Sequence, residues 1–242
     1  MIELIGVHKR FDGQQVLRGV QLAIPDGKLT AIVGPSGSGK TVLIKHIVRL
    51  LRPDAGRVLV DGADIVRLGT TALRRVRERF GVLFQGGALF DSLTVYENVA
   101  FPLRARTQLS EPEIRDRVEE SLDAVSLDGA RYKFPSEISG GMRKRVALAR
   151  AIVLNPRVVL LDEPTTGLDP VLLRTVLRLI RRTHEQFGFT GVLVSHDVPA
   201  IFDVVDSVAM LHDGVVVEHR ETHEFVRSSN PSVRHFLGGV IP

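Results

Sequence analysis

The stretch 34-GPSGSGKT-41 decides the fold of this 242-residue chain. Its pattern is G-x-x-x-x-G-K-[ST], in which small residues lead to a lysine and a hydroxyl. A tight turn needs only one or two glycines, whereas a backbone that wraps around phosphate oxygens needs small residues throughout. The run KLTAIV at 28–33 predicts a buried strand before the stretch, and helical spacing begins after Gly39. The sequence therefore predicts a strand, a phosphate-binding loop and a helix, in that order.

The helix after the loop is predicted to be amphipathic. Its apolar face comprises Leu43, Ile44, Ile47, Val48 and Leu51, and Lys45, His46, Arg49 and Arg52 fall largely on the opposite face. We therefore expect the helix to reach Leu51 and to turn His46 away from the core.

The composition bounds the class of protein. With 44% hydrophobic residues, the chain can build one large α/β domain, and the absence of cysteine excludes disulfides and thiolate metal sites. The N-terminus lacks the pattern of a secretory signal, and no apolar run approaches the roughly 20 residues that span a bilayer. The net charge is +4, and basic residues cluster at 74–79 and 143–145. We interpret these two clusters as solvated helix faces rather than as nucleic-acid or lipid contacts. Any membrane role is expected to be peripheral.

Strands and helices alternate in the rest of the chain. The segments 53–62 and 80–85 predict a hairpin and a buried strand, whereas 91–155 is dominated by helical signals. Capping boxes mark two helix starts there, Thr94 with Glu97 and Ser110 with Glu113. The apolar runs RVVLLDEP and TGVLVSHD flank a further helix pattern. Such alternation predicts a parallel sheet covered on both faces.

Each residue type in the loop suits a polyphosphate. Backbone amides around Gly37 and Gly39 can approach phosphate oxygens because no side chain obstructs them, and the helix N-terminus adds partial positive charge. Lys40 is expected to neutralise the β and γ phosphates of ATP, and Thr41 to offer a hydroxyl to Mg²⁺. The predicted nucleotide-binding residues here are Gly34, Pro35, Ser36, Gly37, Ser38, Gly39, Lys40 and Thr41.

Two adjacent carboxylates, Asp162 and Glu163, end the run VVLLDE. Ligands gather beyond the carboxyl ends of parallel strands, and neighbouring side chains on a strand point in opposite directions, so the pair can serve different partners. We assign Asp162 to Mg²⁺ through its water shell, and Glu163 to orienting and deprotonating the attacking water. Taken alone, the pair is also compatible with a solvated acidic strand end.

Two further polar residues follow predicted strands. His196 comes after VLVS and could reach the γ-phosphate, and Gln85 comes after VLF and could contact Mg²⁺ or the attacking water. Both side chains are also common in purely structural roles. We nevertheless place His196 and Gln85 beside Glu163 as candidate catalytic residues, with Gln85 as a candidate metal ligand.

The stretch EISGGMRKR opens a helix with Ser139, Gly140 and Gly141. A serine and two glycines at a helix start form an anion site, yet the nucleotide already has its phosphate loop. Either these residues only cap the helix, or they serve a second nucleotide that a partner supplies.

Together these motifs resemble the ATP-binding subunits of ABC transporters along nearly the whole chain. The motifs in family order are GPSGSGKT, LFQ, ISGGM, VVLLDEP, TGLDP and VSHD. The resemblance implies an α/β fold of the P-loop NTPase type, with a mostly parallel sheet flanked by helices, an N-terminal antiparallel β subdomain and an inserted helical subdomain. One domain would fill 1–242, with its core at 1–85 and 156–220, the helical subdomain at 86–155 and a tail at 221–242.

The resemblance also implies a head-to-tail dimer that sandwiches ATP between one subunit's loop and the other's signature tip at 139–141. Asp169 of TGLDP would run along the dimer interface, and Phe11 stands where an aromatic ring stacks on adenine in the family. Met142 replaces the glutamine that usually ends the family's signature. ATP and Mg²⁺ are the implied cofactors.

Within the family, the stretches 84–104, 139–152 and 230–239 look most like the ATPases of Mla-type and Mce-type lipid transporters. The implied partners are a second copy, a transmembrane permease and, through the complex, a lipid-binding Mce-domain protein. The implied location is cytoplasmic and peripheral on the inner membrane. Apolar side chains that would either line a groove for a permease helix or fill the subdomain core are Leu89, Phe90, Leu93, Val95 and Phe101.

Two other functions remain open at this point. The ATPase does not touch the cargo, so a transporter for another solute fits the same motifs. A non-transport ABC ATPase is the second alternative, although the roughly fifty residues between Gln85 and Ser139 contain prolines and are too few for a long coiled coil.

Overall fold

The structure is a computed structural model that describes residues 1–127, 129–196 and 198–238. Its first sheet has the strand order β2-β1-β4-β5, with antiparallel neighbours. These strands are β1 Ile2–Phe11, β2 Gln14–Ile24, β4 Ala55–Val60 and β5 Ala63–Asp64. The antiparallel sheet and the hairpin predicted at 53–62 are therefore confirmed.

The second sheet has the order β10-β9-β3-β8-β7-β6 and is parallel except between β9 and β10. Its strands are β3 Leu29–Val33, β6 Phe80–Leu83, β7 Val158–Asp162, β8 Thr190–Val194, β9 Ser207–His212 and β10 Val215–Glu221. This arrangement confirms the predicted α/β fold with a mostly parallel sheet. The parallel strands β3, β6, β7 and β8 all end at one edge, where the candidate site lies.

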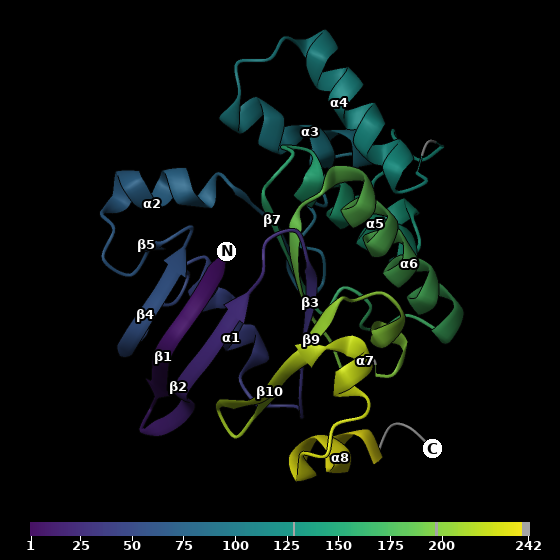
Figure 1. Cartoon of the computed structure of the whole chain (residues 1–242). Coiled ribbons are helices and arrows are strands. Elements are labelled where there is room, and N and C mark those ends of the chain that lie inside the picture. Colours follow the sequence, from purple (N-terminus) through teal and green to yellow (C-terminus); the bar gives the residue numbers. More distant parts are fainter. Residues whose placement is uncertain (128, 197, 239–242) are drawn as a thin grey trace.

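The helices α3 to α6 cover one face of this sheet, and α1 with the antiparallel sheet covers the other. The helices are α1 Lys40–Ile47, α2 Thr70–Arg77, α3 Val95–Arg106, α4 Glu111–Ala124, α5 Gly140–Ile152, α6 Pro170–Phe187, α7 Thr222–Phe225 and α8 Pro231–Gly238, with 3-10 turns η1 Pro135–Glu137 and η2 Ala200–Asp203. In Figure 1, α3 and α4 lie at one end of the molecule and α8 lies at the other. We call α3 to α6 the helical layer. Within the described ranges, every helix lacks the length or the hydropathy needed to cross a bilayer.

The central strands are buried on both faces, as their unbroken apolar runs predict. Alternate residues of β7 enter two separate cores: Val159 and Leu161 pack with the helical layer, whereas Val158 and Leu160 pack with α1 and the antiparallel sheet. The sheet is therefore held rigidly between two apolar layers, and the loops at its carboxyl edge have a fixed base.

Both predicted capping interactions are present. The Thr94 N–H donates to Glu97 Oε2 at 2.7 Å at the start of α3, and the Ser110 N–H donates to Glu113 Oε2 at 2.7 Å at the start of α4. The hydroxyls of Thr94 and Ser110 also donate to these carboxylates, and the hydroxyl and N–H bonds together lower the pKa of both glutamates. The helix starts within 91–155 were thus predictable from local sequence.

The prediction for α1 was wrong in two respects. The helix ends at Ile47 rather than Leu51, because Arg49 has a φ of 51° and the amides of Leu50 and Leu51 turn back to the Lys45 carbonyl. His46 is 1% exposed instead of facing solvent, and burial lowers its pKa. The reason is that α1 packs against both β4 and β7. Because it lies between two layers, little of its surface is exposed to solvent.

Gly81 in β6 allows close contact between the sheet and α5. A Cβ at this position would lie 2.0 Å from the carbonyl oxygen of Ala151. Gly81→Ala is therefore expected to reduce the free energy of unfolding by about 1 to 3 kcal/mol, because β6 and α5 must separate. Urea denaturation checks this value. Gly69→Ala, where a Cβ has open space, should change it by much less, and equal effects of the two substitutions would contradict the steric argument.

Candidate functional site

The glycine loop connects β3 to α1 through backbone that favours glycine. Gly34 has a φ of 148°, and a Cβ there would lie 2.0 Å from the Leu211 carbonyl oxygen. Gly37 and Gly39 also have positive φ values, 78° and 100°. The glycines predicted from the motif thus occupy positions where side chains would be strained or would collide.

Lys40 closes this loop on itself. Its Nζ donates to the carbonyl oxygens of Gly34 at 2.8 Å and Pro35 at 2.9 Å. The side chain is 8% exposed, and burial lowers its pKa, an effect that the charges of Glu163 and Asp162 oppose. The ammonium is therefore held at the centre of the loop, where a phosphate group could exchange for the carbonyl contacts.

A cleft of about 260 Å³ opens over the loop. It is lined by Gln14, Gln15, Val16, Arg18, Pro35, Ser36, Gly37, Ser38, His212, Asp213 and Gly214. Phe11 lies at the end of β1, is 38% exposed and has Lys9 Nζ 5.3 Å from its ring centroid. Its ring is not part of this cleft lining, so its role against adenine remains a prediction.

Thr41 and Asp162 meet where α1 begins and β7 ends. The Thr41 hydroxyl donates to Asp162 Oδ1 at 3.0 Å. Asp162 is 3% exposed, and burial raises its pKa, while the Thr41 hydrogen bond opposes that rise. A hydroxyl and a carboxylate oxygen at one point are the hard ligands that Mg²⁺ prefers, and a nearby cation would favour the ionised carboxylate. These two residues therefore fit a magnesium site.

Glu163 follows β7 instead of ending it, and its φ is 52°. Its N–H donates to the Val194 carbonyl at 3.0 Å. Its Oε2 accepts from the Thr166 hydroxyl at 3.0 Å and lies 2.7 Å from His196 Nδ1. A left-handed conformation costs a non-glycine residue about 1 to 2 kcal/mol, so several contacts combine to hold this carboxylate in place.

Gln85 lies in the loop after β6, where Gly86, Gly87 and Ala88 all have positive φ values. Among the described residues it makes no hydrogen bond to Thr41 or Asp162. Arg150 of α5 donates instead to the carbonyls of this loop, at 2.6 Å to Gly87 and 2.8 Å to Ala88. The structure thus brings His196 to Glu163. Gln85 stands at the same carboxyl edge, after β6, without a hydrogen bond to Thr41 or Asp162 among the described residues. Asp197, the last residue of VSHD, lies outside the described residues.

The signature tip caps α5. Ser139 Oγ accepts from the Met142 N–H at 3.2 Å, and a Cβ on Gly141 would lie 3.5 Å from Leu172. Asp169 caps the neighbouring helix α6, since its Oδ1 accepts from the N–H groups of Val171 at 2.9 Å and Leu172 at 3.0 Å. Both helix starts therefore lie side by side, and sequence reasoning missed the capping role of Asp169.

An apolar groove of about 410 Å³ lies between α2, β6 and the helical layer. Phe90 and Phe101 line it, are 44% and 47% exposed, and have ring centroids 4.9 Å apart. Val95 is completely buried and Leu89 packs on the helical core, so these two residues are core and not groove. The other groove residues are Val48, Leu50, Arg77, Phe80, Gly81, Val82, Phe84, Ala88, Pro102, Arg106, Arg150, Ala151 and Leu154.

Three side chains near the site had no signal in the sequence analysis: Lys144, Arg150 and Thr166. Each contacts the loop after β6 or β7 through a backbone carbonyl or a carboxylate. Such contacts depend on how α5 packs on the sheet.

Comparisons with known proteins agree with this geometry. A family model described as ABC transporter matches residues 17–166. The probable ribonucleotide transport ATP-binding protein mkl of Mycobacterium leprae is 45% identical over 238 residues, 98% of this chain and 69% of the relative. The intermembrane phospholipid transport system ATP-binding protein MlaF of Escherichia coli K12 is 43% identical over 225 residues, 93% of this chain and 84% of the relative.

Solved structures give the same result. The dimeric structure of MJ0796, described as a bacterial ABC transporter cassette, is 33% identical to this chain, with a TM-score of 0.83. The match covers 92% of this chain and 99% of that one. A second structure of that cassette, in a post-hydrolysis state with ADP and Pi, matches equally well.

Lys40→Ala is expected to weaken ATP binding about 10- to 100-fold, because a charged donor at the centre of the loop is lost. Titration with a fluorescent ATP analogue, by itself and in competition with ATP, measures the affinity. Lys28→Ala removes an exposed lysine at the opposite end of β3 and should leave the affinity unchanged. Equal affinities of the Lys40→Ala protein and the parent would exclude this loop as the phosphate site.

Proposed function

The chain belongs to the ABC transporter family as its ATPase subunit, and we propose that the transporter it powers moves phospholipid or a related lipid. The observation that supports a phospholipid cargo is the 43% identity of this chain to the E. coli protein named for intermembrane phospholipid transport. The mycobacterial relative named for ribonucleotide transport favours a second candidate cargo, a nucleotide. Both relatives are ATP-binding proteins of the same kind, so the cargo must be identified by analysing the assembled transporter.

We assign nucleotide binding to the glycine loop. The amides of 34–41 and the Lys40 ammonium would surround the β and γ phosphates, and Phe11 would stack on the base. Thr41 and Asp162 would hold Mg²⁺, and Gln85 after β6 is the third proposed ligand. When bound, Mg²⁺ would neutralise charge on the phosphates.

In this proposal Glu163 is the general base. Its carboxylate would orient the attacking water and take its proton, while His196 holds Oε2 from the other side at 2.7 Å. Thr166 contributes a second fixed donor at 3.0 Å. The carboxylate is therefore already oriented before the water arrives, which reduces the reorganisation needed during the reaction.

A second copy of the chain would complete the site. The tip at 139–141 contacts Met142 and α6 of its own chain, and the backbone amides at this helix start could bind an anion. A head-to-tail dimer would place the tip on the partner's ATP. The related cassette MJ0796 has been solved as a dimer, which supports this arrangement.

The apolar groove between α2, β6 and the helical layer is the proposed docking site for the transmembrane permease. Its exposed aromatic rings suit a short apolar helix, and Arg77, Arg106 and Arg150 at its walls suit acidic flanks of that helix. This contact would hold the ATPase peripherally on the cytoplasmic face of the inner membrane. A lipid-binding Mce-domain protein would join through the permease.

Glu163→Gln is expected to lower the rate of ATP hydrolysis by about 100-fold or more while ATP still binds, because the base is lost but the loop is intact. Phosphate release measured with purified protein, ATP and Mg²⁺, in the presence of the permease if needed, gives the rate. Glu120→Gln changes an exposed glutamate of α4 and should hydrolyse ATP like the parent. Hydrolysis by the Glu163→Gln protein at the parent's rate would remove Glu163 from the mechanism.

Phe101→Glu is expected to abolish co-purification of the membrane permease without weakening ATP binding, because a charge would enter the apolar groove. Val226→Glu introduces the same charge at another exposed apolar site, outside the residues that line the groove, and should retain the permease. Mass spectrometry of the parent complex then identifies the cargo. Phospholipid in the complex supports the proposal, whereas bound ribonucleotide beyond the ATP sites would favour the second cargo.

A further inference from the structure

Lys144 is a buried cation that the proposed mechanism does not use. It lies in the second turn of α5, is 8% exposed, and donates from Nζ to the carbonyl oxygen of Glu163 at 3.4 Å. Burial lowers its pKa, and the negative charge of Glu163 opposes that effect. Among the described residues this buried ammonium has one long hydrogen bond, which is unfavourable for folding, so packing alone does not account for a lysine here.

The carbonyl that Lys144 contacts belongs to the most constrained residue of the site. Glu163 has a φ of 52°, its N–H is bound to Val194 of β8, and its carboxylate is bound by Thr166 and His196. The direction of its carbonyl follows the remaining backbone angle, ψ. Apart from Lys144, the carbonyl accepts only a long bond of 3.4 Å from the Thr166 N–H among the described residues. The angle ψ also sets the course of the chain to Thr166, whose hydroxyl holds the carboxylate. Among the described residues, Lys144 is the side chain that contacts this carbonyl from outside the loop, so it can help to fix ψ and, through Thr166, the carboxylate.

We propose that Lys144 is a positioning residue for Glu163: by holding the carbonyl, it keeps the carboxylate directed at the attacking water. This inference rests on the proposed role of Glu163 as general base. Lys144 and the tip at 139–141 belong to one helix, so the contact also joins two sites. In the proposed dimer the tip serves the partner's ATP, and Lys144 serves the base that acts on this chain's own ATP.

The position of Lys144 is consistent with a connection between the signature tip and Glu163 through α5. Lys144 comes from the helical layer, whereas Glu163 comes from the central sheet, so a shift of α5 relative to β7 would change their distance directly. The bond is long in this structure, at 3.4 Å, compared with about 2.9 Å for an ordinary N–H···O bond. A small approach of α5 toward the sheet would therefore strengthen it, and a small retreat would break it.

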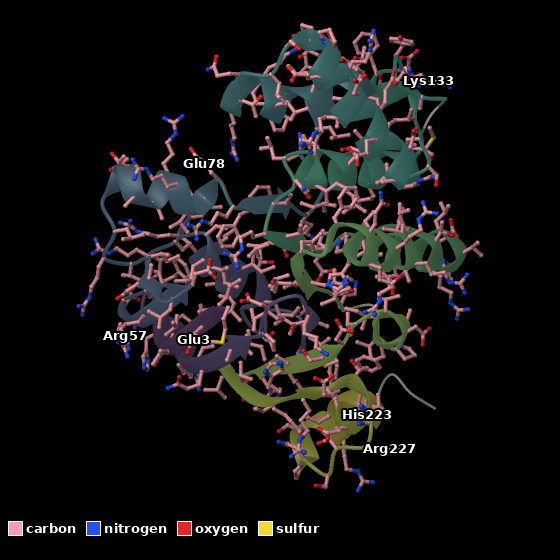
Figure 2. The ribbon with its side chains drawn as sticks, turned by 45° about the horizontal axis from the view of Figure 1, so that its top comes forward. Glu3, Arg57, Glu78, Lys133, His223 and Arg227 are labelled. Carbon is pink, nitrogen blue, oxygen red and sulfur yellow. The ribbon has the colours of Figure 1, made fainter. Side chains whose placement is uncertain are left out.

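Lys144→Met tests the proposal, because methionine fills similar space without charge or donor. We expect kcat for ATP hydrolysis to fall about tenfold, less than the 100-fold that a 1 Å misplacement can cause, with KM for ATP changed less than about twofold. We expect the melting temperature to stay the same or rise, because a buried charge has been removed. Lys133→Met makes the same chemical change at an exposed site on the outer edge of the helical layer (Figure 2) and should leave all three values unchanged.

A double-mutant cycle with Glu163→Gln tests whether Lys144 acts through Glu163. Single-turnover rates of the two single variants and the double variant are compared with that of the parent. If Lys144 acts through Glu163, Lys144→Met lowers the rate about tenfold in the parent but less than about twofold in the Glu163→Gln protein. A tenfold loss in both backgrounds would show that Lys144 acts elsewhere.

Other outcomes separate this inference from the proposed function. An unchanged kcat for Lys144→Met beside an inactive Glu163→Gln protein overturns the positioning role and leaves Glu163 as the base. A fall in kcat together with a lower melting temperature and a higher KM also overturns it, because Lys144 would then be a general structural residue. Full activity of the Glu163→Gln protein overturns the proposed base itself.

Discussion

The site depends on the parallel pairing of β3, β8, β7 and β6, which brings the ends of four strands to one edge of the sheet. Each strand delivers one component there: the glycine loop, His196, the two carboxylates and Gln85. These residues are far apart in the sequence, and only the register of the sheet unites them. Because the sheet is packed between two apolar cores, its edge is a rigid platform and the polar residues on it are held by their backbone.

The charged side chains at this edge lie close together and are almost completely buried. Lys40, Lys144, Asp162 and Glu163 are each at most 8% exposed. Two cations and two anions balance, yet their hydrogen bonds go mainly to backbone carbonyls, to Thr41, to Thr166 and to His196, and not to one another. Such a pattern does not maximise the stability of the empty protein. It keeps charged groups available for a ligand that carries both phosphate and metal charge.

Local chemistry explains which features could be predicted from the sequence. The glycine loop, the capped starts of α3 and α4, and the doubly buried strands all follow from rules that act over a few residues. The expectation for His46 was wrong because its burial depends on a second layer, since α1 lies between two sheets. For Val95 the sequence left groove and core open, and the structure places it in the helical core. The left-handed Glu163 and the contacts of Lys144 and Arg150 depend on how α5 packs against strand ends. The spacing of residue types along the sequence does not predict that packing.

Helix α5 connects three parts of the proposed mechanism: the signature tip, the base Glu163 and the groove. Ser139 caps its start, Lys144 reaches the Glu163 carbonyl, and Arg150 near its end holds the loop after Gln85 and forms part of the groove. A helix of 13 residues moves as a nearly rigid rod, so a displacement at one of these contacts changes the others. A permease segment that enters the groove and touches Arg150 would therefore act on both the base of one subunit and the signature tip that faces its partner. This physical connection requires no moving part other than the helix itself.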